Sequence, residues 1–385
     1  MLFCWSGQPE TSIDVFYWRG PEGWLNQHIF KVDPVSEIDR RYFYYLLKYL
    51  NANFVRIARN KQTTGLGHVT KKDLQRLVVG LPERNEQRAI AHVLGTLDDK
   101  IELNRKMNAT LEAMARAIFK SWFVDFDPVV YKAVQAGNPV PERFAAAADR
   151  YQNSAPPPVP DHIAALFPDR FEESELGEIP AGWRVGTLGD MVSVIKGKSY
   201  KSAELQDSDI ALVTLKSIAR GGGYQVEGLK PYVGRFKSEQ LISPGEIVVA
   251  HTDVTQAAEV LGRVARVPSH PEFKALIASL DLAIVRPNEK WFSNEFLFGV
   301  LADERFVHHA QGYANGTTVL HLNKNAVAEY RLLLPSRAVV EAFTTLTRPM
   351  YELAVNHESA GRVLSEIRDA LLPKLISGEI RVGER

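Results

Sequence analysis

Basic and hydroxyl side chains gather in two regions of the sequence, and together they could bind a polyanion. The first set is Arg56, Arg59, Lys61, Thr63, Thr64, Lys71 and Lys72; the second is Lys196, Lys198, Tyr200, Lys201, Lys216, Thr317 and Thr318. Lysine and arginine suit phosphate groups, whereas hydroxyl side chains suit base edges. A solvated loop remains the simpler interpretation of any single residue. Recurrence in two regions favours the prediction that both sets bind DNA.

The same regions give little support for catalysis. Lys196-Gly197-Lys198-Ser199 resembles the end of a phosphate-binding loop, but Val192 stands where that motif needs its first glycine. His308 and His309 are adjacent and have no further ligand at metal-site spacing. No nucleophile elbow and no carboxylate–lysine set for phosphodiester cleavage is evident. The sequence therefore predicts a binding protein with no catalytic residue, no metal and no cofactor of its own.

The composition limits which parts of the chain could bind a polyanion. The formal net charge is zero, so affinity for a polyanion has to come from local patches. Cys4 is the only cysteine, which excludes a disulfide framework and a cysteine-rich zinc site. No apolar run reaches about 18 residues, the length that a membrane-spanning helix needs. We expect a cytoplasmic protein that does not bind membranes.

Two long stretches carry the heptad spacing of helices that pack on each other. Residues 84–123 contain no proline, and at about 1.5 Å per residue they would form a rod roughly 60 Å long. The polar Asn104 and His357 fall at matching positions, where they could fix the register or merely be tolerated. The predicted pairing residues are Ile90, Val93, Leu97, Asn104, Met107, Leu111, Met114 and Ile118 in the first stretch, and Phe343, Leu346, Met350, Leu353, His357, Leu364, Ile367 and Leu371 in the second.

The two stretches belong to a tandem duplication. One constant shift aligns Leu111 with Leu364, Leu81-Pro82 with Leu334-Pro335, and residues 68–71 with residues 321–324. Residues 1–7 correspond to residues 247–253, whereas roughly residues 175–246 have no counterpart in the first copy. A mis-set start codon, a true truncation and a compact variant all remain open as explanations. Each copy is a globular part followed by a long helix.

The predicted organisation follows from this repeat. We expect a partial first domain over 1–82, a long helix over 83–127, a proline-rich linker over 128–175, a complete domain over 176–335, a second long helix over 336–378 and a tail over 379–385. Within the first domain the pattern predicts a helix over 39–50 and a strand over 77–79. Strands and helices interleave without regular βαβ spacing, which indicates an α+β fold of two mixed domains. The two long helices should pack on each other.

Three stretches resemble the specificity subunits of type I restriction-modification enzymes. They are LPERNEQRAIAHVLGTLDDKIELNRKMNATLEAMARAIFKSWFVDFDP (81–128), ELGEIPAGWRVGTLGD (175–190) and LLPKLISGEIRVGE (371–384). The resemblance covers nearly the whole chain. It implies two target-recognition domains that each read one half of a split site in double-stranded DNA. It also implies that the two long helices pack as an antiparallel coiled coil and act as the spacer. The first of these domains starts here at what corresponds to its middle.

The resemblance also implies partners. Methylation with S-adenosylmethionine would belong to methyltransferase subunits, two of which would dock on the chain. ATP-driven translocation and Mg-dependent cleavage would belong to restriction subunits. Two other functions stay open: a degenerate or half-site subunit that only scaffolds its partners, and a self-contained nuclease fused to recognition modules.

Overall fold

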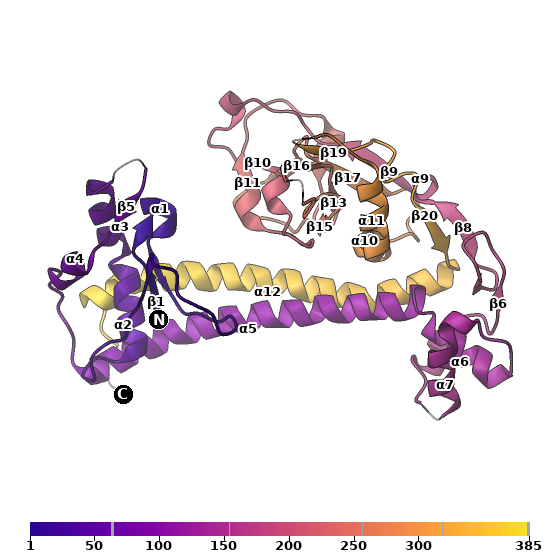
Figure 1. The fold of residues 1–385 in the computed structure, drawn as a ribbon, viewed down its shortest axis with the longest axis horizontal. Coiled ribbons are helices and arrows are strands. Elements are labelled where there is room, and N and C mark those ends of the chain that lie inside the picture. Colours follow the sequence, from indigo (N-terminus) through magenta and orange to yellow (C-terminus); the bar gives the residue numbers. More distant parts are fainter. Residues whose placement is uncertain (63–64, 154, 256, 318, 383–385) are drawn as a thin grey trace. The chain divides into compact units, whose positions relative to one another are not determined.

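The computed structural model describes residues 1–62, 65–153, 155–255, 257–317 and 319–382. The chain divides into two compact units. Unit 1 comprises Met1–Ala109 and Asn356–Arg385, and unit 2 comprises Thr110–Val355. Each of the two long helices, α5 (Arg84–Phe123) and α12 (Arg337–Ser377), therefore contributes one segment to each unit (Figure 1).

Unit 1 is built on a small antiparallel sheet with the strand order β3-β1-β4. The central strand β1 buries Phe3, which contacts Phe54 edge-on at 5.1 Å between ring centroids. The Asp39 side chain caps α2 by accepting from the backbone N–H groups of Arg41 and Tyr42. The elements are β1 (Leu2–Cys4), β2 (Ser6–Gly7), α1 (Pro9–Ser12), β3 (Asp14–Phe16), β4 (Ile29–Lys31), α2 (Arg40–Tyr49), α3 (Asn51–Asn60), β5 (Gly67–His68) and α4 (Lys71–Gln75).

The helix predicted over 39–50 is thus present as α2, but the strand predicted over 77–79 is not. Residues 76–83 have no regular structure, and Val78 is almost fully exposed. An apolar triplet forms a strand only if a neighbouring strand pairs with it, and no strand lies beside this one among the described residues.

Unit 2 holds two four-stranded sheets, with the orders β11-β10-β16-β12 and β15-β13-β17-β9. Only the β10–β16 pairing is parallel within them. Their strands are β9 (Val192–Lys196), β10 (Ile210–Val213), β11 (Leu229–Pro231), β12 (Leu241–Ile242), β13 (Ile247–Ala250), β15 (Val264–Arg266), β16 (Ala275–Ala278) and β17 (Leu282–Pro287). The shorter pairings involve β6 (Phe171–Glu172), β7 (Ile179–Pro180), β8 (Arg184–Thr187), β14 (Thr252–Asp253), β18 (Ala314–Asn315), β19 (Leu320–Leu322) and β20 (Arg331–Leu334).

Short helices cover these sheets and form the proline-rich region. Around the sheets lie α9 (Leu188–Met191), the 3-10 turns η2 (Ser202–Glu204), η3 (Leu215–Ser217), η4 (Val226–Gly228) and η5 (Ser238–Gln240), and the helices α10 (Asn294–Ala302) and α11 (Glu304–Gly312). The proline-rich region carries α6 (Asp127–Ala136), η1 (Glu142–Phe144), α7 (Ala145–Gln152) and α8 (Asp161–Ala164). Val130, Ala148 and Tyr151 form a small core there.

The topology confirms that the two globular parts are copies of one design. Strand β13 pairs antiparallel with β15 and β17, as β1 pairs antiparallel with β3 and β4. Strand β14 pairs with β19, as β2 pairs with β5. The predicted fold class, an α+β protein with mixed domains in tandem, is confirmed.

The two long helices pack antiparallel in both units. In unit 1, Ile90 and Leu94 near the start of α5 share a buried cluster with Leu375 near the end of α12. The Asp98 carboxylate accepts from Tyr45 on α2 and from Arg368 on α12, at 2.5 and 2.7 Å. This charge therefore ties the first globular part to both helices.

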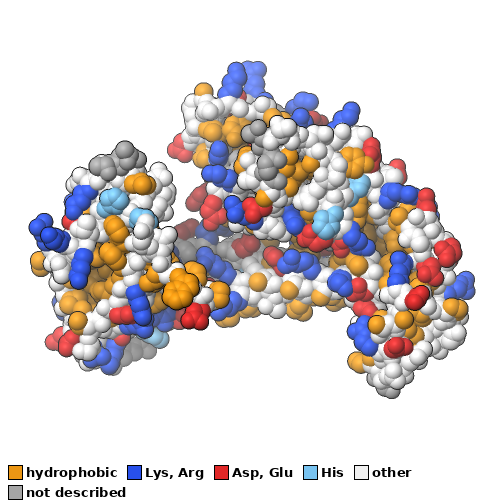
Figure 2. All heavy atoms as spheres, in the orientation of Figure 1, with side chains coloured by type: hydrophobic (Ala, Val, Ile, Leu, Met, Phe, Trp, Pro, Cys, Tyr) orange, Lys and Arg blue, Asp and Glu red, His pale blue; other side chains and the backbone are white. Residues whose placement is uncertain are grey.

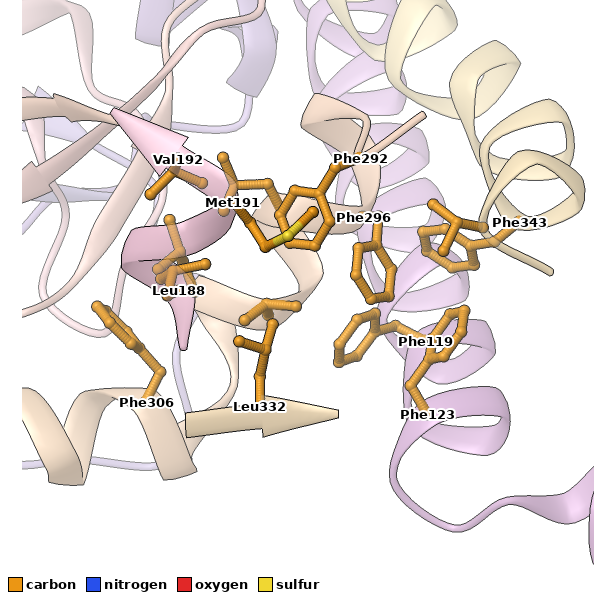
Figure 3. Packing of buried hydrophobic residues seen from close by; sticks show 14 of the residues in the cluster. Phe119, Phe123, Leu188, Met191, Val192, Phe292, Phe296, Phe306, Leu332 and Phe343 are labelled. Carbon is orange, nitrogen blue, oxygen red and sulfur yellow. The ribbon is translucent and has the colours of Figure 1, made fainter. Parts of the chain in front are cut away.

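The corresponding contacts in unit 2 are aromatic. Phe119 and Phe123 near the end of α5 meet Phe343 near the start of α12 at 6.0 and 5.3 Å between ring centroids. Phe296 on α10 approaches Phe123 at 4.9 Å, so these rings join both helices to the second globular part (Figure 3). Gly299 permits this approach, because a Cβ there would lie 2.2 Å from the Phe119 ring.

The predicted pairing residues differ in burial. Ile90, Asn104 and Phe343 are buried, whereas Met114, Leu346, Leu353 and Ile367 are 40–46% exposed and lie at the margin of the buried stripe. The others are half-buried: Val93, Leu97, Met107, Leu111, Ile118, Met350, His357, Leu364 and Leu371. Beside five predicted positions the next residue along the helix is buried instead: Leu94 and Ala115 in α5, and Thr347, Tyr351 and Ala354 in α12.

Asn104 and His357, which occupy equivalent positions in the two copies, contact each other in unit 1. The Asn104 side-chain amide donates to the backbone carbonyl of His357 at 3.4 Å, and His357 Nδ1 lies 2.9 Å from Asn108 Oδ1. Asn104 is 2% exposed. A buried amide of this kind disfavours other registers, because a shift would leave it without its partner.

Truncation of the aromatic contact should destabilise unit 2. Phe343→Ala removes a fully buried ring that contacts α5 and α10, so we expect the free energy of unfolding to fall by about 3–5 kcal/mol. Urea denaturation followed by circular dichroism measures it. The control Val363→Ala, on the exposed side of the same helix, should change stability by less than about 0.5 kcal/mol. Equal losses in the two variants would contradict the packing role of Phe343.

Candidate nucleic-acid interface

The candidate basic residues of unit 1 lie on α3 and α4. Arg56 and Arg59 are on α3, Lys61 follows it, and Lys71 and Lys72 begin α4; all five are exposed. Arg59 is paired with Glu10 at 2.5 Å, and Lys61 is paired with Asp73 at 2.6 Å. These two cations are therefore partly neutralised.

The remaining three are not paired with an acid among the described residues. Arg56 donates only to the Asn53 side chain, and no acidic partner of Lys71 or Lys72 is present. Lys61 and the Thr70 hydroxyl both hydrogen-bond to Asp73 and lower its pKa to about 2. This carboxylate stays charged at neutral pH and keeps Lys61 in place. Thr63 and Thr64 lie outside the described residues.

In unit 2 the lysines lie at the end of an edge strand. β9 ends at Lys196. The backbone of Lys198 then bonds on either side of Ser279 at the end of β16, donating to Ala278 at 2.7 Å and accepting from Leu280 at 2.9 Å. Glycine is required at position 197, between the two lysines, because a Cβ there would lie 1.9 Å from the carbonyl oxygen of Ser279. This close crossing of the backbone fixes where the two lysines emerge. Neither lysine has an acidic partner among the described residues.

A histidine lies beside these lysines at the point where β13 gives way to β14. The His251 N–H donates to the carbonyl of Asp281, and its own carbonyl accepts from Leu322. Burial and the positive charge of Lys196 lower the pKa of His251 to about 4, so its ring is neutral at physiological pH. Among the described residues, the buried His251 Nε2 and the buried Ser279 hydroxyl have no hydrogen-bond partner.

The same frame recurs in unit 1 around Trp5. The backbone N–H of Trp5 donates to the carbonyl of His28, and the backbone carbonyl of Trp5 accepts from the N–H of Val69. These two bonds match the backbone bonds of His251. The Trp5 indole nitrogen is likewise buried without a partner among the described residues. Position 5 and position 251 are therefore structurally equivalent and chemically different.

A hydroxyl–histidine contact follows each of these positions. Ser6 Oγ lies 2.8 Å from His68 Nδ1 in unit 1, and Thr252 Oγ1 lies 3.4 Å from His321 Nδ1 in unit 2. The sequence interpretation did not include these residues. The signal was present, because the alignment of the two copies already matched His68 with His321.

The other candidates of unit 2 are not brought into one group with Lys196 and Lys198. Tyr200 faces Lys230, whose ammonium lies 5.8 Å from the ring centroid. Lys216 is exposed on η3, Lys201 precedes η2, and Thr317 is exposed in the loop before β19. Thr318 lies outside the described residues. On the face drawn in Figure 2, basic and acidic side chains are interspersed, and no single basic patch dominates.

The described residues hold no candidate metal site. Within the described part of the chain, no group of three or more His, Cys, Asp or Glu side chains could hold a metal ion. A helix both long enough and apolar enough to cross a bilayer is likewise not found there.

The chain is similar to proteins that carry a DNA specificity domain. Residues 3–113 match the family model of the type I restriction modification DNA specificity domain. The specificity subunit of the type I restriction enzyme HindI from Haemophilus influenzae is 27% identical over 377 residues, which cover 91% of this chain and 79% of that protein. The MjaIX specificity subunit from Methanocaldococcus jannaschii is 28% identical over 373 residues, covering 93% of this chain and 73% of that protein.

A solved structure, the S subunit of a type I restriction-modification system from M. genitalium, has a TM-score of 0.46 and 16% identity, covering 97% of this chain and 82% of that chain. The resemblance to type I specificity subunits that the sequence indicated is confirmed by the match of the domain and by the curated relatives. Over nine-tenths of its length the chain is thus similar to specificity subunits of type I restriction enzymes, and residues 3–113 match their DNA specificity domain.

The neutral His251 ring should make unit 2 sensitive to acid. Its pKa is about 4 when folded and about 6.5 in the unfolded chain, so the unfolded state alone gains a proton between these values. The contribution of His251 to the free energy of unfolding is thus fully present above about pH 6.5 and is lost as the pH falls toward 4. This loss is at most about 3 kcal/mol. Urea denaturation at pH 7.5 and pH 4.5 should show a smaller acid-induced loss in His251→Phe than in the wild type. Equal losses would contradict the assignment.

Proposed function

We propose that this chain reads a bipartite target in double-stranded DNA and scaffolds the other subunits of a type I restriction-modification complex. One observation carries the proposal. Two copies of one α+β design are each followed by a long helix, and the helices pack antiparallel. A duplicated reader suits a target with two halves, and each half would be read by one copy.

Unpaired basic residues support DNA contact in each copy. Arg56, Lys71 and Lys72 in unit 1 and Lys196 and Lys198 in unit 2 would anchor phosphates. The candidates for base-edge contacts are His251 beside Lys196, its equivalent Trp5, and Thr63, Thr64, Thr317 and Thr318. The differing chemistry at positions 5 and 251 would let the two copies prefer different half-sites.

The chemical steps would then belong to partner subunits. We propose that the chain is non-catalytic and holds no cofactor. Two methyltransferase subunits would use S-adenosylmethionine, and restriction subunits would use ATP and Mg. A solved structure that the chain resembles in part concerns complex assembly of a type I system. A cytoplasmic location, where DNA and these partners would meet, completes the proposal.

A second candidate is a subunit that scaffolds its partners but reads only one half-site. The sheet of unit 1 has three strands where the corresponding sheet of unit 2 has four. A reader with an incomplete sheet could keep its helix pairing and lose its sequence preference.

A genome-wide map of methylated bases separates the two candidates. It is made in cells that express this chain with its cognate methyltransferase subunit. We expect a split motif with two defined halves. A motif with one half, or a symmetric repeat of it, would assign the reading to unit 2 alone, and the absence of any motif would contradict the proposed function.

The helices should set the spacing between the half-sites. Seven residues inserted into both α5 and α12 lengthen each helix by about 10 Å. The non-specific spacer of the methylated motif should therefore grow by about three base pairs, at about 3.4 Å per pair, with unchanged half-sites. Insertion into α5 alone is the control. It should abolish specific methylation, because the contacts between α5 and α12 would then be out of register. An unaltered spacer in the double insertion would disprove the spacing role.

A further inference from the structure

Unit 2 contains a cavity of about 340 Å³ between the end of α5, the proline-rich region, α10 and β20. Its inner wall is aromatic: Phe119, Phe123 and Phe296 are buried, and Leu332 on β20 lies across from them (Figure 3). Contacts between the rings hold this wall in place, since the ring centroids of Phe123 and Phe296 are 4.9 Å apart. A preformed apolar cavity of a few hundred Å³ is typical of sites for small molecules.

The solvent side of the cavity is positively charged. Three exposed arginines, Arg143, Arg305 and Arg331, and the exposed Leu176 line it there, and no aspartate or glutamate is among the described residues of the lining. Burial raises the pKa of Tyr330, another lining residue, and the positive charge of Arg305 opposes this rise. The charge of Arg305 therefore acts on the cavity wall.

The three guanidinium groups keep hydrogen-bond donors available. Arg305 is paired with Asp303 at 2.7 Å, Arg331 is paired with Glu175, and Arg143 donates to one backbone carbonyl. These contacts occupy one or two of the five N–H donors of each guanidinium. Each arginine could therefore bind an anion without giving up its present partner.

Unit 1 shows that the fold itself does not require two of these charges. Alignment of the two copies places α10 and α11 over α2 and α3, with Ala52 at the position of Arg305 and Val78 at the position of Arg331. The helix pair of unit 1 forms without either charge. The two arginines are thus specific to the cavity of unit 2.

We propose that this cavity binds a small organic anion. The aromatic or aliphatic body of the ligand lies against the rings, and its carboxylate, sulfonate or phosphate group lies at the arginines. Burial of the body removes apolar surface from water, and the guanidinium groups supply charge-assisted hydrogen bonds. The ligand contacts α5, α10 and β20 together, so its binding stabilises the packing of the second globular part on α5. This site is independent of the proposed DNA contacts.

A matched pair of fluorescent probes tests the proposal on the full chain. Anilinonaphthalene sulfonate carries an anionic group, whereas phenylnaphthylamine has the same aromatic body without a charge. We expect saturable binding of the sulfonate probe at one site per chain. Leu176→Glu places a negative charge at the opening, so it should weaken the sulfonate probe at least tenfold and the neutral probe less than twofold. The matched control Leu176→Gln has the same shape as Leu176→Glu without the charge, and it should affect both probes less than threefold.

Substitution of the arginines gives a second comparison. The double variant Arg305→Gln/Arg331→Gln should also weaken the sulfonate probe at least tenfold. The control Arg337→Gln removes an exposed, ion-paired arginine of α12 that does not line the cavity, and it should bind like the wild type.

Hydrogen exchange locates the bound probe without any variant. At saturating sulfonate probe, peptides that contain β20 should exchange at least twofold more slowly, whereas peptides from β1 to β4 should not change. Absence of saturable binding would overturn the proposal and leave the cavity as a packing gap only. Equal weakening of both probes by Leu176→Glu, unaltered binding in the double arginine variant, or unchanged exchange in β20 would each overturn it as well.

Discussion

The antiparallel pairing of α5 and α12 is the constraint on which the rest of the structure depends. Neither helix can bury its apolar face against its own globular part alone. In unit 1 the start of α5 is covered by α2 and by the end of α12, and Asp98 bonds to both of these helices. In unit 2 the end of α5 is covered by Phe296 and Phe343 in the same way. Each copy therefore needs a helix segment that the other copy supplies.

This mutual dependence explains both what the sequence predicted and where it erred. The heptad pattern predicted the two helices and their pairing, and the resemblance to specificity subunits implied the antiparallel arrangement. However, at several predicted positions the buried residue is the next one along the helix, as with Thr347 and Ala354 in place of Leu346 and Leu353. A heptad pattern assumes one partner helix. Here a globular part shares the same face, so the centre of the buried stripe turns toward it, and a straight α-helix also drifts from a 3.5-residue repeat.

The candidate site was predictable in part for a similar reason. Lys196 and Lys198 could be selected from the sequence because charge and spacing are local properties. His251 could not, because its role depends on the crossing of β13, β16 and the loop after β9, which are distant in sequence. Alignment of the two copies comes closest to revealing it, since it places His251 over Trp5 and His321 over His68. Such a comparison finds equivalent positions. Only the fold shows that Trp5 and His251 each bury a ring nitrogen that has no partner among the described residues.

A net charge of zero is compatible with DNA binding because the acids are not spread evenly over the cations. Glu10 and Asp73 neutralise Arg59 and Lys61, and the low pKa of Asp73 makes that neutralisation permanent at neutral pH. Lys71 and Lys72 beside them, and Lys196 and Lys198 in the other copy, keep their charge available. Ion pairing thus leaves only some of the cations available to bind phosphate, and it holds the neighbouring loops in place. In each copy the DNA phosphates would then contact a few fixed cations, which set the position of the domain on the DNA. A uniform positive field would instead bind any DNA equally.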